Sequence, residues 1–269
     1  ARSVIPPGTA AGRDFSGLAP QLPAFDFEAC VGCMTCVNAC PDTAIFGVAL
    51  PEGATAAAVS AFAATQPDPD ATAAALRAHF SHTQKYAEVP ARKGHEPAAF
   101  GIFVDPGHCK GCGECVEVCD ALGYHALRMV DKEPREADGI GTVERYRRDI
   151  AFFRSLPPTP PEYRNEKALA DLMLGEQAMG YVGGAGSCAG CGEATAIRML
   201  VAATRQVHGP ESMGIVAATG CNSVFGATYP YNPYLVPWTN SLFENAPADA
   251  LGIRARWDQA GHPERRLWV

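Results

Sequence analysis

The chain has 269 residues, of which 47% are hydrophobic, and a formal net charge of −7. This composition is sufficient for a packed core and argues against wholesale disorder. The scattered basic residues argue against nucleic-acid binding, and no apolar run reaches the roughly 18 residues that a membrane helix needs. The N-terminus also lacks the apolar region of a secretory signal.

Eleven cysteines are the dominant feature of the composition. An odd number argues against a closed disulfide framework. Clustered cysteines are more often metal ligands than disulfides where the surroundings are reducing. We therefore expect a metal-binding protein of the cytoplasm.

Residues 1–25 are rich in Pro, Gly and Ala, and we predict a connecting arm there. Residues 26–131 contain a strand–loop–helix pattern twice, each time around four cysteines. An Ala-rich insertion at about 47–97 separates the two copies. It predicts two short helices interrupted by "QPDPD", and we expect it to loop out of the repeated unit.

The two cysteine blocks share one spacing, C-x₂-C-x₂-C-x₃-C, which is that of bacterial ferredoxins with two [4Fe–4S] clusters. Three thiolates of a block bind one cluster, while the fourth, already on the following helix, ligates the other cluster. The predicted ligand sets are therefore Cys30, Cys33, Cys36 and Cys119 for the first cluster, and Cys40, Cys109, Cys112 and Cys115 for the second. Small residues such as Gly32, Gly111 and Gly113 would let backbone N–H groups approach the sulfurs.

Structural zinc is the alternative for these blocks, since zinc sites also use Cys-x-x-Cys pairs. Zinc sites usually consist of two pairs and a spacer, however, and here four cysteines fall within eleven residues, twice. The spacing favours iron–sulfur clusters. Asp120 stands where a proline would follow the second block, which changes no ligand.

Residues 132–180 are charged and contain "SLPPTPPEY", so we predict a linker. Within it, "NEKALADLMLGEQAM" predicts an amphipathic helix that ends at Gly180. The remaining segment, 181–269, begins a new domain. In it "GIVAATG" predicts a buried strand that runs into a glycine turn, and "RRLWV" predicts a further strand.

Three stretches of this last segment match one family in order: "GSCAGCGEATAIRML", "AATGCNSVFGATYPYNPY" and "WTNSLFENAPADALGIR". They resemble the thiamine-diphosphate domain of pyruvate:ferredoxin (flavodoxin) oxidoreductase and related 2-oxoacid:ferredoxin oxidoreductases. That family also places a two-cluster ferredoxin domain directly before this domain. The resemblance covers most of 26–46 and 98–130 and nearly all of 181–269. It implies an α+β ferredoxin-like two-cluster domain followed by the first part of an α/β thiamine-diphosphate-binding domain.

The resemblance implies a third [4Fe–4S] cluster close to the thiamine. Cys188, Cys191 and Cys221 would be three of its ligands, with the fourth beyond Val269. Glu193 and the loop of Cys221 would lie against thiamine diphosphate. The family's magnesium signature, which begins "GDG", follows a strand like "RRLWV", so we expect the Mg²⁺ ligands outside these residues and no turnover by this chain alone.

Each of these residues also has a simpler interpretation. Cys188 and Cys191 also fit a redox dithiol, and Cys221 fits a small buried hydrophobe. Glu193 also fits an ordinary first-turn carboxylate. We favour packing or a partner interface for "YPYNPYLVPW". We favour surface or packing roles over ligand roles for His108, His125 and His208.

The expected function is therefore part of an enzyme that decarboxylates a 2-oxoacid, most simply pyruvate, and forms an acyl-CoA. Electrons would pass through three [4Fe–4S] clusters to ferredoxin or flavodoxin. The expected partners are the remaining domains or subunits, coenzyme A and the 2-oxoacid, within a dimer of the complete unit. The alternatives are an electron-transfer subunit without thiamine chemistry, or an enzyme for 2-oxoglutarate or aryl-pyruvates. Because the chain stops at a strand, we expect a segment of a longer protein.

Overall fold

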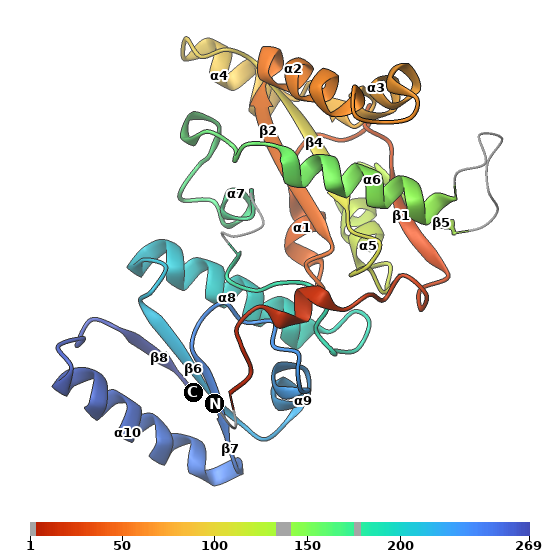
Figure 1. Ribbon diagram of the computed structural model, residues 1–269. Helices are drawn as coiled ribbons and strands as arrows, with labels where there is room; N and C mark the ends of the chain where they lie inside the picture. Colours follow the sequence, from red (N-terminus) through yellow and green to blue (C-terminus); the bar gives the residue numbers. More distant parts are fainter. Residues whose placement is uncertain (1–3, 133–140, 175–178) are drawn as a thin grey trace. The chain divides into compact units, whose positions relative to one another are not determined.

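The computed structural model describes residues 4–132, 141–174 and 179–269 (Figure 1). The chain divides into two compact units. The cysteine-block unit comprises residues 15–40 and 44–176, and the parallel-sheet unit comprises residues 1–14, 41–43 and 177–269.

The cysteine-block unit is built from two copies of a strand–loop–helix–strand motif. In each copy a strand ends five residues before the first cysteine of the block, and a short helix begins at the fifth residue after that cysteine. The elements of this unit are β1 (Gln21–Phe25), α1 (Thr35–Ala39), β2 (Ile45–Pro51), α2 (Glu52–Ala63), α3 (Pro69–Arg77), β3 (Phe80–Ser81), the π-helical turn η2 (Gln84–Glu88), α4 (Val89–Arg92), β4 (Ala98–Val104), α5 (Glu114–Ala121), β5 (Leu127–Asp131), α6 (Thr142–Ser155), the 3₁₀ turn η3 (Pro161–Tyr163) and α7 (Leu169–Leu172).

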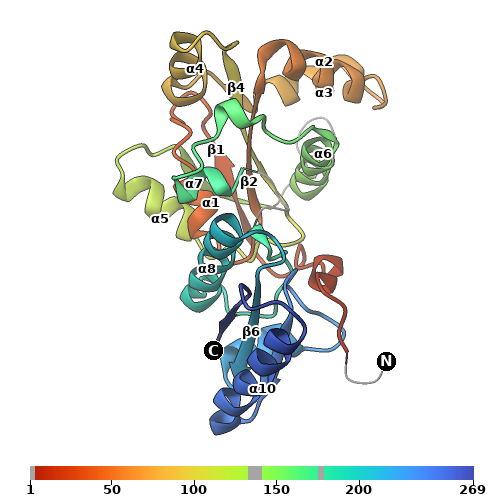
Figure 2. The same ribbon diagram turned by 90° about the vertical axis from the view of Figure 1, so that its left-hand side faces the viewer.

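The two copies pair strand with strand in an antiparallel sense. The outer strands β1 and β5 pair with Gln21 opposite Asp131, and the inner strands β2 and β4 pair with Ile45 opposite Val104. Helices α1 and α5 lie in contact with each other (Figure 2). Pro23 is tolerated within β1 because this strand pairs on one side, with β5. Strand β1 ends at Phe25, whereas the sequence suggested that the first strand lies after residue 25.

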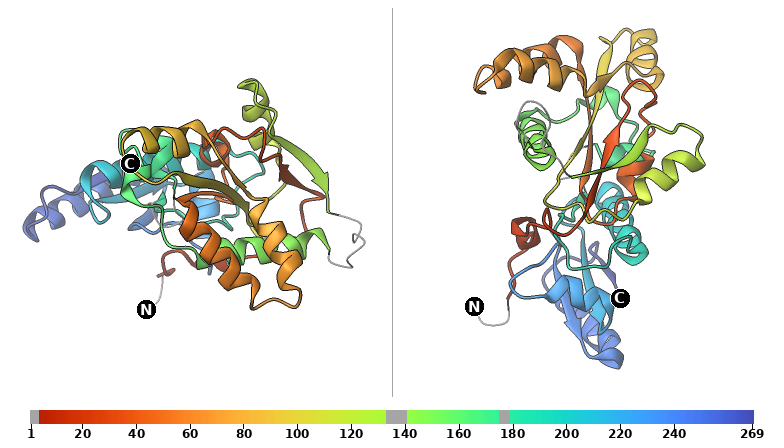
Figure 3. Two further views of the ribbon diagram at one scale, coloured as in Figure 1. Left: turned by 90° about the horizontal axis from the view of Figure 1, so that it is seen from above. Right: turned by 90° about the vertical axis from the view of Figure 1, so that its right-hand side faces the viewer.

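The insertion packs onto the unit, contrary to the expectation that it loops out. Helices α2 and α3 confirm the two predicted helices, and Asp68 caps α3 by accepting a hydrogen bond from the Ala71 N–H at 3.0 Å. After them, β3 pairs with β4 as a third strand of the inner sheet. Phe62 of α2 and Phe80 of β3 both contact the ring of Phe152 in α6. In the left-hand view of Figure 3 the orange helices α2 and α3 lie beside the green helix α6. The insertion therefore enlarges the core of the cysteine-block unit.

Within the predicted linker, the long helix is α6, and it begins much earlier than the helix that the sequence suggested at 165–179. Of that stretch the structure shows only the turn α7 as helix, and residues 175–178 lie outside the described residues. Helix α6 buries Ile150, Phe152 and Phe153, and Phe153 stacks on Phe46 of β2 with ring centroids 5.2 Å apart. Aromatic burial against the inner sheet explains why this charged segment is helical.

The parallel-sheet unit contains three strands in the order β7–β6–β8, all parallel. Along β6 the side chains alternate, so Met213 and Ile215 pack with α8 while Val216 packs with α10 on the opposite face. The strands expected at "GIVAATG" and "RRLWV" are confirmed as β6 and β8. The elements of this unit are the 3₁₀ turn η1 (Thr9–Gly12), α8 (Gly192–His208), β6 (Met213–Ala218), α9 (Cys221–Ala227), β7 (Trp238–Ser241), the 3₁₀ turn η5 (Phe243–Asn245), α10 (Ala246–Gln259) and β8 (Arg266–Trp268).

Candidate iron–sulfur sites

The first predicted ligand set converges on one cavity. This cavity is lined by all four thiols assigned to the first cluster, including the one that comes from the second block. The other lining residues are mainly apolar and come from both copies of the motif. The cavity is lined by Phe25, Cys30, Val31, Cys33, Met34, Thr35, Cys36, Phe100, Ile102, Cys119, Tyr124, Ala126 and Leu127. A largely apolar chamber with four thiols fits a [4Fe–4S] cluster, which Cys thiolates hold.

The pKa of the Cys30 thiol is affected by sulfurs of the same predicted set. Burial raises the pKa of the Cys30 thiol, the Gly32 N–H lowers it, and the neighbouring Cys33 and Cys119 sulfurs raise it further. For Cys36, burial raises the pKa well above its usual value, and the neighbouring sulfurs of Cys30, Cys115, Cys33 and Cys119 raise it further. Thiols with raised pKa values resist ionisation, so a bound cation is the natural way to stabilise their thiolates here.

The second predicted set is arranged in the same way around Cys115. Burial raises the pKa of Cys115, and the nearby sulfurs of Cys40, Cys109 and Cys112 raise it further. Cys112 is exposed, whereas the other three thiols are buried. The sulfur of Cys40, from the first block, is thus a neighbour of the second block, as the crossed ligand scheme requires.

The two cysteine loops repeat one backbone conformation. Gly32 and Gly111, at matching positions, have φ of 72° and 68°, and Met34 and Gly113 have φ of 67° and 84°. A left-handed residue between two ligands turns the peptide so that successive N–H groups form a concave surface that suits anionic groups. Both loops therefore have the backbone that an anionic cluster needs.

The last cysteine of each block receives a backbone hydrogen bond. The Ala44 N–H donates to Cys40 Sγ at 3.4 Å, and the Ala126 N–H donates to Cys119 Sγ at 3.3 Å. Before each donor stands a non-glycine residue in the left-handed region, Thr43 with φ 46° and His125 with φ 50°. Such bonds to ligand sulfurs help to set the reduction potential of a cluster.

The sequence did not predict the contacts of the residues that flank the two blocks. Thr43 is buried and its hydroxyl accepts a hydrogen bond from Arg198 Nε at 2.7 Å, while His125 is exposed and its Nδ1 lies 2.8 Å from Asp120 Oδ1. His108 is buried, with Nδ1 3.3 Å from Asp105 Oδ2. No short-range sequence pattern predicts these contacts, because the first two depend on the turn that follows each block and the third on the turn that precedes the second block.

Gly111 offers a test of the second loop. A Cβ there would lie 3.0 Å from Ala19 Cβ and 3.1 Å from the Gln21 carbonyl oxygen, whereas a Cβ on Gly113 would meet no atom within 4 Å. Gly113→Ala carries only the left-handed cost of roughly 1–2 kcal/mol. Gly111→Ala adds overpacking of about 1–3 kcal/mol. We expect a lower Tm for Gly111→Ala than for Gly113→Ala in the cluster-loaded protein. Equal Tm values would contradict the close approach of the loop to Gln21.

The predicted third set lies in the parallel-sheet unit. Cys191 is the N-cap of α8 and its Sγ accepts a hydrogen bond from the Ala194 N–H at 3.4 Å, while Cys221 opens α9. Cys188 and Cys221 are exposed and Cys191 is half-buried. Among residues 4–132, 141–174 and 179–269, no three His, Cys, Asp or Glu side chains are gathered closely enough to hold a single metal ion.

Glu193 and the α9 residue Asn222 both lie close to Tyr234. Burial raises the pKa of Tyr234, and the Glu193 carboxylate raises it further. The Tyr234 hydroxyl donates to Asn222 Oδ1 at 2.6 Å, and the Trp238 indole N–H donates to the same oxygen at 3.2 Å. Tyr234 and Trp238 belong to the stretch expected to serve packing or an interface. Tyr234 is in fact core, and its hydroxyl reaches the first turn of α9.

Comparisons with known proteins agree with the cysteine pattern. Residues 23–46 match one 4Fe–4S binding domain family and residues 106–121 match another. The chain is 29% identical over 266 residues to the pyruvate-flavodoxin oxidoreductase of Rhodospirillum rubrum, which covers 93% of this chain and 19% of that protein. It is 29% identical over 254 residues to a probable pyruvate-flavodoxin oxidoreductase of Escherichia coli, covering 90% of this chain and 18% of that protein.

A third relative is the pyruvate dehydrogenase [NADP(+)] of Cryptosporidium parvum, which is 28% identical in an alignment of 275 positions that covers 98% of this chain and 12% of that protein. The chain thus spans about a fifth or less of the length of these curated relatives. The resemblance found in the sequence is confirmed, as is the presence of ferredoxin-type 4Fe–4S domains in a mixed α/β chain. The relatives are oxidoreductases. In the described residues, no helix has the length and apolar character to cross a membrane.

Proposed function

We propose that this chain is a segment of a 2-oxoacid:ferredoxin oxidoreductase that acts on pyruvate. The segment carries the electron-transfer clusters and the first part of the thiamine-diphosphate domain. The observation that carries the proposal is the crossed neighbourhood of the cysteines. Cys119 lines one cavity together with Cys30, Cys33 and Cys36, and the Cys40 sulfur is a neighbour of Cys115. Two clusters held in this way lie close together, as transfer of single electrons between them requires.

In this proposal the two ferredoxin-type clusters receive electrons from a third cluster, of which Cys188, Cys191 and Cys221 are ligands. Residues elsewhere in the complete cytoplasmic enzyme complete that cluster and bind Mg²⁺, coenzyme A and the 2-oxoacid. Thiamine diphosphate supplies the chemistry of decarboxylation when it is bound. Reduced ferredoxin or flavodoxin leaves with the electrons. The names of the relatives, which include pyruvate and flavodoxin, support this choice of substrate and carrier.

Iron analysis of the complete enzyme, purified without oxygen, tests the cluster count. Three [4Fe–4S] clusters amount to about twelve irons per chain, and two clusters to about eight. A value near twelve together with thiamine binding supports the full proposal. A value near eight without thiamine binding would identify an electron-transfer subunit instead, and a colourless zinc protein would overturn both.

Glu193 provides a residue-level prediction. It stands exposed in the first turn of α8, beside the Tyr234–Asn222 pair, where a carboxylate can accept a hydrogen bond from a donor on the aminopyrimidine of thiamine. Hydrogen bonds to charged groups contribute about 1.5–3 kcal/mol. Glu193→Gln is therefore expected to weaken thiamine diphosphate binding by about 10- to 150-fold in calorimetric titrations of the complete enzyme with Mg²⁺ present.

Glu211→Gln is the matched control. Glu211 is also exposed, and it follows the C-terminal end of α8, whereas Glu193 stands at the N-terminal end. We expect its thiamine affinity to equal that of the unaltered enzyme. If Glu193→Gln binds thiamine diphosphate as tightly as Glu211→Gln does, Glu193 is an ordinary first-turn carboxylate and has no part in the site.

A further inference from the structure

Tyr181 is buried completely, yet its hydroxyl has no hydrogen-bond partner among the residues that the structure describes. A buried hydroxyl without a partner is destabilising, which is why nearly all such groups in folded proteins are paired. A phenylalanine would fill the same space without that cost. The hydroxyl therefore points to a group that is bound when the protein is complete.

The orientation of the Tyr181 ring is well defined. The ring meets the ring of Tyr234 edge to face, with centroids 5.3 Å apart and an interplanar angle of 85°. The flanking backbone is tied to the same segment, since the Val182 N–H donates to the Pro233 carbonyl at 2.8 Å and the Leu235 N–H donates to the Gly180 carbonyl at 2.9 Å. The Tyr181 ring is thus held in place, so an acceptor for its hydroxyl has to come to it when a further group is bound.

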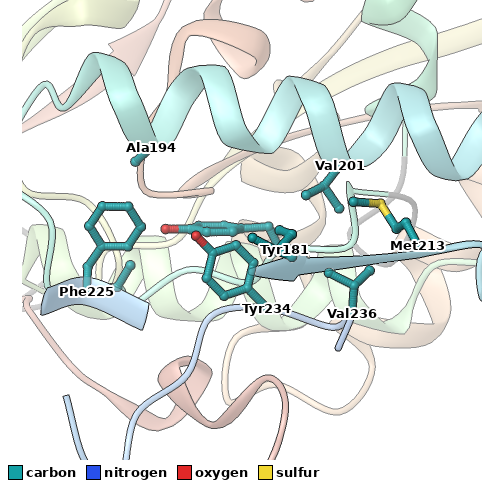
Figure 4. Close-up of a cluster of buried hydrophobic side chains, with 9 residues drawn as sticks. Tyr181, Ala194, Val201, Met213, Phe225, Tyr234 and Val236 are labelled. Carbon is teal, nitrogen blue, oxygen red and sulfur yellow. The ribbon is translucent and has the colours of Figure 1, made fainter. Parts of the chain in front are cut away.

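Figure 4 shows the hydroxyls of Tyr181 and Tyr234 at the same end of the hydrophobic cluster, the end where Ala194 and Phe225 lie. Ala194 is in the first turn of α8 and Phe225 is in α9. The Tyr234 hydroxyl at this end is already used by Asn222. The Tyr181 hydroxyl faces the same region, where two helices begin at predicted cluster ligands.

Cys191 is the candidate acceptor at this end. It packs against the same hydrophobic cluster, and its sulfur already accepts the Ala194 N–H. A tyrosine phenol is protonated at neutral pH and can therefore donate a hydrogen bond. A cluster-bound thiolate is a strong acceptor, and hydrogen bonds to ligand sulfurs tune the potential of a cluster.

We infer that Tyr181 is a positioning residue that donates a hydrogen bond to Cys191 Sγ when Cys191 ligates the third cluster, and that this bond raises the reduction potential of that cluster. The direction follows from charge: a donor on sulfur stabilises the more negative, reduced cluster. The inference rests on the proposed function, because it requires that the third cluster exists.

The test is Tyr181→Phe in the complete enzyme, followed by redox titration with EPR detection. We expect a negative shift of the midpoint potential of the third cluster, with the other two clusters unchanged. In D₂O, pulsed ENDOR should also show that an exchangeable deuteron coupled to the third cluster is lost in the variant. Tyr163→Phe is the matched control, since Tyr163 is buried in the cysteine-block unit and donates to the Glu96 carbonyl at 2.8 Å. It should change none of the three potentials.

The experiment separates a failure of this inference from a failure of the proposed function. If the third cluster is present but Tyr181→Phe leaves its potential and deuteron coupling unchanged, the inference is wrong while the proposed function stands. A gain in Tm for this variant would then identify the hydroxyl as an unpaired group. If the unaltered enzyme contains no third cluster, the inference and the proposed function both fail.

Discussion

Replacing Cys40 with alanine is expected to abolish the cluster of the second block and to preserve the cluster of the first, although Cys40 belongs to the first block in sequence. The reason is the crossed arrangement: the Cys40 sulfur is the neighbour of Cys115 that raises its pKa most after burial. Cys30 and Cys36 instead line one cavity with Cys119. Of the eight irons of the two ferredoxin-type clusters, the variant should lose about four.

EPR of the reduced protein measures this outcome, because two neighbouring clusters give a spin-coupled spectrum that becomes simple when one is lost. Cys119→Ala is the matched variant and should give the reverse result, with loss of the first cluster only. The two sulfurs are comparable, since each is buried and each accepts a backbone N–H, from Ala44 or Ala126. Loss of the first cluster in Cys40→Ala would show that each block binds its own cluster.

The predicted ligand scheme follows from local spacing, which the sequence alone supplies. Four cysteines at fixed intervals specify which sulfurs share a loop and which one lies on the next helix, whatever surrounds them. The glycines at 32, 111 and 113 also have left-handed backbones, which glycine favours. Met34 occupies the equivalent of Gly113 without being a glycine. Nothing in its residue type predicts this, and the space for its buried side chain depends on Gly47, where a Cβ would lie 2.3 Å from Met34 Sδ.

Helix α6 shows why other parts were not accessible. Its sequence, "TVERYRRDIAFFRS", is strongly charged and precedes a proline-rich stretch, so composition favours a linker. Its aromatic residues become meaningful only once Phe46, Phe80 and Phe103, distant in sequence, form the surface that Phe152 and Phe153 cover. Tertiary packing decides the structure of this segment, and local propensity does not. The unpaired hydroxyl of Tyr181 is likewise visible only in three dimensions.

Asp171 lies in the turn α7, which the sequence suggested as part of a longer helix, and its contacts predict a large loss of stability when it is replaced. The side chain of Asp171 is 1% exposed and accepts hydrogen bonds from Lys85 Nζ, from the Tyr86 hydroxyl at 3.2 Å and from the Asn165 N–H at 2.8 Å. Tyr86 is also buried completely, stacks on Phe100 at 4.8 Å, and approaches Gly32 so closely that a Cβ there would lie 2.9 Å from its ring. Asp171 therefore holds the residue that covers the first cysteine loop.

Asp171→Ala is expected to lower the free energy of unfolding by about 3 kcal/mol, because breaking a buried ion pair costs about 3–5 kcal/mol and Lys85 retains some access to water. For a unit of this size that corresponds to a fall in Tm of roughly 6–12 °C. The loosened Tyr86 should also let the first cluster decay faster than the second under oxygen, which EPR can follow.

Glu88→Ala is the control. It removes an exposed ion pair with Arg92 in the same region, and such pairs contribute about 0–1 kcal/mol. If both variants shift Tm equally, or if the two clusters decay together in Asp171→Ala, then Asp171 does not support the first loop through Tyr86.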